Sequence, residues 1–239
     1  MKQTISIILL MMFHVVQAAT PSYQESVNQY MEKSKNSKSP FSEADMAIMK
    51  KADETLAKMM PSPGIKAGEK APDFSLKNAF GNTVNFKDEL KKGPVVLVFY
   101  RGAWCPFCNM HLHALQKSLS EFKKYGAQLI TITPQTPDKS AEQIKKDGYP
   151  FEVLSDLDSK VMKDYMLYFE LPDDLVAVYK KAGLNVESFN GIGRNVLPVP
   201  GSFVIDSNGT VQAMHAQTDY KARMEPSAII DALKKISIN

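Results

Sequence analysis

The sequence predicts an α/β domain built on a mixed β-sheet, and three observations support this fold class. Residues Pro94–Tyr100 form a continuous apolar run of strand length, as expected for a strand that is buried on both faces of a sheet. After Cys105, apolar side chains recur every three or four residues, which is the spacing of one helical face. Near the end of the chain, Ser207-Asn208-Gly209 separates two apolar segments and favours a hairpin turn. Strands that alternate with helices and then end in a hairpin and a helix indicate a mixed sheet flanked by helices.

The remaining elements follow from the same patterns. An N-terminal helix is expected over Phe41–Met60, because Met46, Met49, Leu56 and Met59 recur at roughly helical spacing and a methionine stripe usually packs in a core. In the domain that follows, we expect, in chain order, a helix from Cys105 to a stop at Gly126, a strand over Ala127–Thr133, a helix over Ser140–Lys146, strands over Phe151–Leu154, Gly201–Asp206 and Thr210–Met214, and a closing helix over Pro226–Ile236.

The start of the chain has the pattern of a secretory signal peptide. Met1-Lys2 is a short positive segment, Ile5–Phe13 is a nearly unbroken apolar run, and Val16-Gln17-Ala18 offers small residues before a cleavage site. An uncleaved anchor is the lesser alternative, because a spanning helix needs ~20 apolar residues. We therefore expect a signal peptide over 1–18, a polar, helical extension over 19–66 and one domain over 67–239. The mature protein would lie in an oxidising compartment, a bacterial periplasm, without stable membrane insertion.

Composition and charge exclude several classes of protein. Of the 239 residues, 44% are hydrophobic and 23% are charged, so collagen-like, disordered and polytopic membrane proteins are poor fits. The net charge of +3 gives no basis for a nucleic-acid surface, which needs a concentrated basic face. Two cysteines are too few for a multi-bridge scaffold or a four-cysteine zinc site. No cofactor is expected.

Both cysteines lie where the buried strand meets its helix. Cys105 is expected at the first helical turn, where unpaired backbone N–H groups and the helix dipole favour an anion, so its thiol should be acidic and nucleophilic. Cys108 lies one turn further on the same face and can close a small disulfide ring. Such a bridge restrains little chain, which favours redox cycling over a structural disulfide. Metal binding stays open as an alternative, because His111 and His113 follow closely and soft metals accept such ligands.

Three stretches of the sequence match motifs of a known family. They are GEKAPDFSL at Gly68–Leu76, YRGAWCPFCN at Tyr100–Asn109 and PVPGSFVID at Pro198–Asp206. On these motifs, the segment Ala67–Leu233 resembles the AhpC/TSA branch of the thioredoxin-fold superfamily, the peroxiredoxin-like proteins. The resemblance implies a thioredoxin-like fold.

The resemblance also implies a thiol peroxidase. Cys105 would attack hydrogen peroxide or an organic hydroperoxide and become a sulfenic acid, and Cys108 would condense with it to a disulfide. Thioredoxin, or in a periplasm a thioredoxin-like dithiol donor, would then reduce the pair. Arg101 and Trp104 would contact the substrate or partner. Pro200 matches the cis-proline of the thioredoxin fold, whose loop faces the redox cysteine, so a cis peptide bond is expected there.

The loop before Cys105 departs from the family pattern. Conventional peroxiredoxins carry Thr or Ser three residues before the peroxidatic cysteine, where this chain has Gly102, and their activating arginine before the late strand is missing. We expect Arg101 to substitute for that arginine. Arg194 and Arg223 are weaker candidates, and we expect both on the surface.

Two alternatives to the peroxidase stay open. One is a thiol:disulfide oxidoreductase that acts on protein cysteines through the same pair, with Trp104 and the Pro200 loop forming the groove for the partner. The other, a minor one, is a copper chaperone of the thioredoxin fold that binds the metal through both cysteines and a histidine such as His215.

Overall fold

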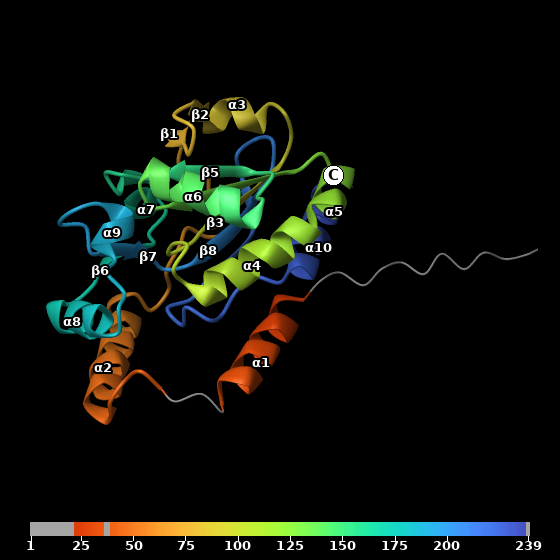
Figure 1. Cartoon of the computed structure of the whole chain (residues 1–239). Coiled ribbons are helices and arrows are strands. Elements are labelled where there is room, and N and C mark those ends of the chain that lie inside the picture. Colours follow the sequence, from red (N-terminus) through yellow and green to blue (C-terminus); the bar gives the residue numbers. More distant parts are fainter. Residues whose placement is uncertain (1–21, 36–38, 238–239) are drawn as a thin grey trace, which may run out of the picture.

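A seven-stranded mixed sheet runs through the part of the chain that the computed structural model describes, residues 22–35 and 39–237 (Figure 1). Its strand order is β2-β1-β5-β4-β3-β8-β9, and a separate small sheet pairs β6 with β7. The strands are β1 (Ser75–Asn78), β2 (Thr83–Asn85), β3 (Val95–Phe99), β4 (Gln128–Thr133), β5 (Glu152–Ser155), β6 (Tyr168–Glu170), β7 (Val196–Pro198), β8 (Gly201–Ile205) and β9 (Val211–Ala216). The predicted α/β class with a mixed sheet is confirmed.

Helices connect and cover these strands. Within the described residues they are α1 (Tyr23–Ser34), α2 (Glu43–Met59), α3 (Phe86–Leu90), α4 (Pro106–Lys117), α5 (Leu119–Lys124), α6 (Pro137–Asp147), α7 (Lys160–Asp164), α8 (Asp173–Lys181), α9 (Glu187–Asn190) and α10 (Pro226–Ile236). Strands β3, β4 and β5 are parallel neighbours, so β4 and β5 must each be reached by a crossover, which α4 and α5 supply before β4 and α6 supplies before β5. Strand β8 returns antiparallel to β3.

Strand β3 is buried on both faces, as its apolar run predicts. Val96 and Val98 belong to a core that includes side chains of α4 and α10, whereas Val95, Leu97 and Phe99 belong to a second core with side chains of α3 and α7. All five are fully buried. Each such side chain contributes about 1.5–3 kcal/mol on leaving water. The strand is therefore a rigid base for the loop that follows it.

The predicted single helix from Cys105 to Gly126 is wrong in one respect: it is broken at Ser118. This residue leaves helical geometry, with φ −98° and ψ 1°, and its hydroxyl donates to Ala114 O at 2.9 Å. A serine hydroxyl that bonds the carbonyl four residues back competes with the helical ladder and bends the chain. The apolar spacing continues across the break, which explains why the sequence pattern did not reveal it.

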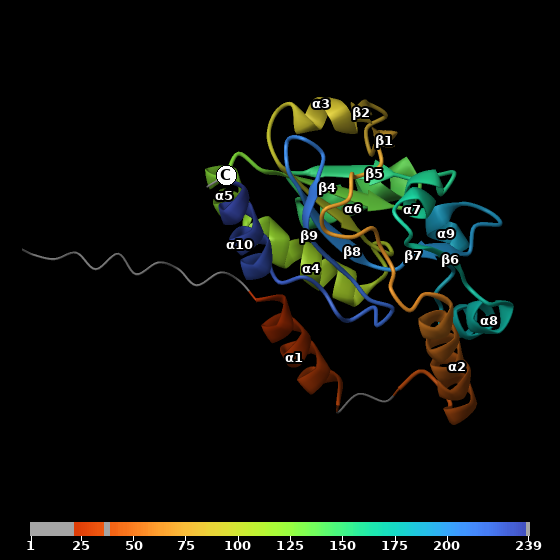
Figure 2. The same ribbon diagram turned by 180° about the vertical axis from the view of Figure 1, so that it is seen from behind.

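In its described residues, the N-terminal extension contains two helices that pack against different parts of the domain (Figures 1 and 2). Helix α1 packs on α4, and α2 packs on α8, where Lys181 Nζ donates to Asp45 Oδ2 at 2.6 Å. The predicted helix over Phe41–Met60 is confirmed, but its methionine stripe is only partly core. Met46 and Met59 are exposed, whereas Leu56 and Met49 pack against buried clusters, because α2 contacts α8 and the domain through one face only. Helix α1 was not predicted.

Several expectations concern the ends of the chain. The predicted signal peptide over 1–18 lies outside the described residues, and the boundary at 66/67 stays a prediction. In the described part of the chain, no helix has the length and apolar character that crossing a membrane would require.

Candidate active site

Cys105 is the N-cap of α4, at the end of the loop that leaves β3. Its backbone is extended, with φ −90° and ψ 111°, and Pro106 takes the first helical position, where the missing N–H costs nothing. Cys105 and Cys108 are free thiols, and each is only 1% exposed. The predicted position of the pair at the strand-to-helix junction is confirmed, and the helix N-terminus favours negative charge there.

Gly102 is required by the shape of this loop. Its φ is +147°, and a Cβ added to it would lie 2.6 Å from Trp104 Nε1 and 3.1 Å from Gln135 Oε1. Any larger residue would push the indole or the buried amide away. The threonine that conventional peroxiredoxins carry at this position therefore has no room in this chain.

Arg101 lies in the wall of the site, and it is 5% exposed. Its guanidinium lies 4.8 Å from the ring centroid of Trp104 and 4.7 Å from that of Tyr220, and Nη2 donates to Tyr179 Oη at 3.1 Å. Aromatic faces and a hydroxyl neutralise only part of its charge. Arg101 thus keeps a positive field that acts on Cys105.

Arg223 is a second buried arginine at the site, and its predicted place on the surface is wrong. It is 8% exposed, and its Nη2 lies 3.4 Å from Cys108 Sγ. The sequence around it is polar and contains no periodic signal, so only the packing of the segment before α10 reveals the contact. Arg194 has a different role, since it donates to Pro134 O, Asn190 O and Asp156 O and ties three loops together.

The two thiols have opposite electrostatic environments. The hydrogen bond from Cys108 is the largest cause that lowers the pKa of Cys105, to about 5; burial opposes it, and Arg101 and Arg223 reinforce it. Burial, followed by the hydrogen bond and charge of Cys105, raises the pKa of Cys108 well above its ordinary value. The arrangement therefore favours a thiolate at Cys105 and a thiol at Cys108.

The histidines near the cysteines have other partners. His111 is buried, its Nε2 donates to Met224 O at 3.0 Å, and burial, followed by the charge of Arg223, lowers its pKa to about 3. His113 Nδ1 pairs with Gln116 Oε1 at 3.2 Å. In the described ranges, no three His, Cys, Asp or Glu side chains come together as a metal site. The copper-binding alternative through His215 therefore lacks a ligand set there.

Pro200 is buried between β7 and β8, and the expected cis bond is wrong, because every described peptide bond is trans. Val199 N donates to Leu167 O at 2.7 Å and continues the extended course of β7 toward Gly201. An extended chain before proline accommodates the trans form, which is the ground state of the bond. Nothing in the described contacts of Pro200 tests the predicted partner groove.

A small cavity of about 60 Å³ adjoins the site. Arg101, Tyr179 and Tyr220 line it from the domain, and Asp53 and Leu56 line it from α2. Burial raises the pKa of Asp53, and the charge of Arg101 opposes this. The extension thus forms one wall next to the active-site arginine, which the sequence did not predict.

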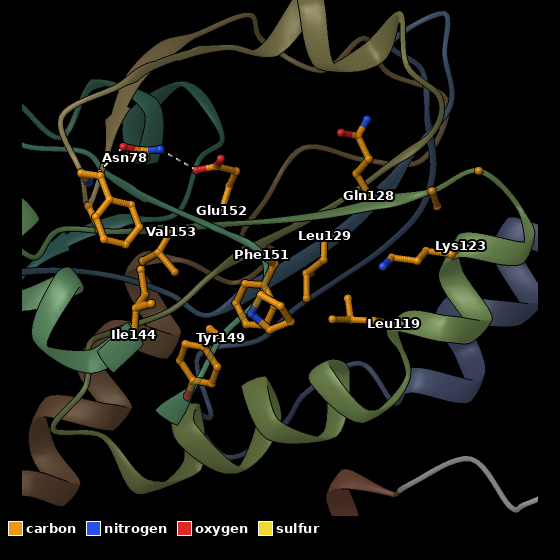
Figure 3. Close-up of a pocket in the computed structure, with 15 residues that line it drawn as sticks. Asn78, Leu119, Lys123, Gln128, Leu129, Ile144, Tyr149, Phe151, Glu152 and Val153 are labelled. Carbon is orange, nitrogen blue, oxygen red and sulfur yellow. Dashed lines mark hydrogen bonds between the residues drawn. The ribbon is translucent and has the colours of Figure 1, made fainter. Parts of the chain in front are cut away.

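A larger cavity of about 520 Å³ lies elsewhere, between α5, α6 and the strands β4 and β5 (Figure 3). Leu129, Tyr149 and Phe151 line it, with Lys123 and Glu152 among the charged residues. Neither cysteine nor either active-site arginine contributes to its wall. This cavity is therefore separate from the cysteine pair and its two arginines.

The AhpC/TSA family model matches residues 67–214, which include the whole loop from β3 to α4 and most of the domain. The chain belongs to the AhpC/TSA family. Among its relatives, peroxiredoxin Bcp of Escherichia coli K12 is 28% identical over 171 residues, which span 72% of this chain and 97% of the relative. Chloroplastic peroxiredoxin Q of Gentiana triflora is 29% identical over 171 residues, spanning 72% of this chain and 66% of the relative.

Solved structures of peroxiredoxins share the fold of this chain. Peroxidoxin BcpB of Mycobacterium tuberculosis superposes with a TM-score of 0.57 at 22% identity, over 72% of this chain and 98% of that one. Peroxiredoxin Q of Xanthomonas campestris superposes with a TM-score of 0.53 at 19% identity, over 69% of this chain and 91% of that one. The predicted thioredoxin-like fold is therefore confirmed. With peroxiredoxins as its relatives, this AhpC/TSA protein is an oxidoreductase of the peroxiredoxin type.

Proposed function

We propose that this protein is a thiol peroxidase in which Cys105 reduces hydrogen peroxide or an organic hydroperoxide and Cys108 resolves the product. The observation that carries the proposal is the position of Cys105, buried at the N-terminus of α4 beside Arg101, with its thiol pKa lowered to about 5 by Cys108 foremost. A thiolate held in this way is a nucleophile at neutral pH.

In the first step, the Cys105 thiolate attacks the terminal oxygen of the peroxide. The S–O bond forms as the O–O bond breaks, sulfur loses two electrons, and the leaving oxygen takes up a proton from solvent to give water or an alcohol. The product is a sulfenic acid at Cys105. Arg101 stabilises the negative charge that moves onto the departing oxygen, because its charge is held in a dry site.

In the second step, Cys108 attacks the sulfur of the sulfenic acid. The S–S bond forms, the S–O bond breaks, and hydroxide leaves and takes a proton to become water. The negative charge of Cys105 is among the causes that keep the pKa of Cys108 high, after burial, and this charge is absent from the sulfenic acid. Arg223, 3.4 Å from Cys108 Sγ, then favours the Cys108 thiolate. The first step therefore prepares the second.

A dithiol donor of the thioredoxin type would close the cycle. It supplies two electrons through a mixed disulfide and returns both cysteines to thiols. We place this cycle in a periplasm, on the signal-peptide pattern of residues 1–18. Expression of the full chain in a bacterium, with N-terminal sequencing of the periplasmic fraction, tests this placement: a chain that starts at Ala19 supports it, and an unprocessed chain in the cytosol contradicts it.

The burial of Cys105 favours a small substrate over a protein disulfide. The residue is 1% exposed, and α1 packs on α4, the helix that Cys105 caps. A peroxide can reach a thiolate through a narrow opening, whereas a protein cysteine must bring its backbone close to the nucleophile. This observation supports the peroxidase over the protein oxidoreductase.

The test is the rate at which the reduced protein consumes peroxide. Cys105→Ser should abolish consumption, and Cys108→Ser should allow one turnover and then hold a sulfenic acid that dimedone labels at Cys105. The stable fold of both variants is checked by circular dichroism. A reduced wild type that scarcely reacts with peroxide but exchanges rapidly with protein disulfides would overturn the proposal.

A further inference from the structure

A set of buried and half-buried amide side chains surrounds Ala103, two residues before Cys105. Gln135, in the loop between β4 and α6, is fully buried, and its Oε1 accepts from Ala103 N at 2.8 Å. On the other side, Asn109 Nδ2 donates to Ala103 O at 2.7 Å. Both polar groups of one peptide residue are therefore bound by side chains from different elements.

These two contacts belong to one continuous chain of hydrogen bonds. Gln135 Nε2 donates to Gln143 Oε1 at 3.3 Å, and Gln143 Nε2 donates to Asn109 Oδ1 at 3.1 Å. Tyr100 adds a branch, because its hydroxyl accepts from Gln135 Nε2 at 3.4 Å and donates to Gln143 Oε1 at 2.9 Å. The chain starts at the N–H of Ala103 and returns to its carbonyl.

The Ala103 peptide determines which amide atoms donate and which accept in this circuit. Because Ala103 N–H can only donate, Gln135 must present its oxygen to it and its amide nitrogen to Gln143. The same logic fixes Gln143 and then Asn109, whose nitrogen is left to face Ala103 O. A flip of any one amide would set two donors or two acceptors against each other. Buried networks that are fully satisfied in this way are rigid.

We propose that Gln135 is a positioning residue for Cys105 and that it acts through this circuit on the Ala103 peptide. The inference rests on the proposed nucleophilic role of Cys105. The loop carries both Arg101 and Cys105, and Cys105 N donates to Gly102 O at 3.1 Å within it. Holding Ala103 therefore fixes where the thiolate lies relative to the arginine and to the N-terminus of α4.

The experiment measures alkylation of Cys105 by iodoacetamide as a function of pH in the reduced full-length protein, with the modified cysteine identified by mass spectrometry. Alkylation follows the thiolate and needs no peroxide. Gln135→Met keeps the volume of the side chain and removes its hydrogen bonds. We expect its pH midpoint to move from about 5 toward the ordinary 9.0. A shift of one pH unit makes alkylation at acid pH about tenfold slower.

Two further variants keep the test decisive. Asn109→Ala removes the last donor of the circuit at its half-buried end and should move the midpoint in the same direction by less. Gln128→Met is the matched control, because it removes a hydrogen bond to Glu89 O at the opposite end of β4 and should leave the midpoint unchanged.

Different results would contradict the role of the circuit and the proposed function. Equal midpoints in wild type and a folded Gln135→Met would overturn the circuit, and if that variant does not fold, an unchanged midpoint in Asn109→Ala would overturn it. A wild-type midpoint near the ordinary value would contradict the nucleophilic role of Cys105 instead. Rapid alkylation of the wild type at low pH and a raised midpoint in Gln135→Met, combined with no peroxide consumption, would contradict the peroxidase and support the circuit.

Discussion

The guanidinium of Arg223 is directed at the sulfur of Cys108 and not at a carboxylate. Nη2 lies 3.4 Å from Sγ, and within the described residues Nε and Nη1 have no hydrogen-bond partner. A buried cation without a full set of partners is costly unless an anion forms beside it. This contact therefore links the arginine to the state of the proposed cycle in which Cys108 is a thiolate.

Arg223→Met should slow the formation of the disulfide more than the reaction with peroxide. The substitution keeps the bulk of the side chain and removes the charge that favours the Cys108 thiolate. We expect the sulfenic acid to live about tenfold longer, the effect of one pKa unit on the thiolate. Rapid mixing with peroxide followed by dimedone trapping measures this lifetime. Arg194→Met, which removes hydrogen bonds to loop carbonyls, is the control, and an equal lifetime in both variants would contradict the role of Arg223.

His111 should make the protein less stable in mild acid. Burial holds its pKa at about 3, against an ordinary value of 6.5, so only the unfolded chain takes up this proton between these values. Stability is then present above pH 6.5 and is lost as the pH falls toward 3, by at most about 1.4 kcal/mol per pH unit.

The measurement for this prediction is urea unfolding at neutral pH and in mild acid. His111→Gln retains an N–H donor for Met224 O but does not titrate, so its free energy of unfolding should depend less on pH than that of the wild type. His113→Gln is the control, since that ring pairs with Gln116 and lies outside the core. The same pH dependence in wild type and His111→Gln would exclude this source of acid sensitivity.

Gly102→Thr should lower both stability and activity, although it introduces the residue that conventional peroxiredoxins have. The φ of +147° and the contact of 2.6 Å with Trp104 Nε1 force the loop to move. We expect the free energy of unfolding to fall by about 1–3 kcal/mol, which is the usual cost of a strained backbone position. Gly148→Ala is the control, because it also has a positive φ but no atom within 4 Å of the added carbon. A Gly102→Thr protein as stable as wild type, with faster peroxide reduction, would refute the prediction.

Glu225→Ala should release the start of α1 from the domain. The Glu225 carboxylate accepts from Tyr23 N at 3.0 Å and from Gln24 N at 2.7 Å, in the manner of a helix cap supplied from another part of the chain. We expect the free energy of unfolding to fall by about 0.5–2 kcal/mol and hydrogen exchange in α1 to become faster. Hydrogen exchange followed by mass spectrometry measures the exchange rate of the α1 amides. Glu32→Ala removes an exposed ion pair with Lys35 and should change neither stability nor hydrogen exchange. Unchanged hydrogen exchange in α1 of Glu225→Ala would contradict the role of Glu225 in holding this helix.

Local patterns predicted the parts of the fold that local periodicity determines. The closing helix over Pro226–Ile236 has its predicted bounds, and β3 lies within the predicted apolar run. In the helix, burial repeats with the helical period, whereas every side chain of β3 is buried, so a periodic pattern records the first and a continuous apolar run records the second.

The missed features depend on contacts between distant segments. Arg223 and Cys108 are 115 residues apart, and nothing near Arg223 in the sequence distinguishes it from a surface arginine. Helix α1 buries only Tyr23 and Val27, which is too few for a periodic signal. The circuit around Ala103 joins polar residues of α4, of α6 and of the loop before α6. These segments are distant in the sequence and meet only because the strands before them pair in the sheet.

Trp104 is the single tryptophan of the chain, and it precedes Cys105 directly, with the guanidinium of Arg101 4.8 Å from its ring. Indole emission is quenched by nearby sulfur and changes with local charge. All intrinsic fluorescence that this protein emits on excitation of tryptophan therefore originates beside Cys105. For the proposed cycle, the chain would contain its own optical reporter of the thiol, sulfenic acid and disulfide states, and one turnover could be followed in real time without an introduced label.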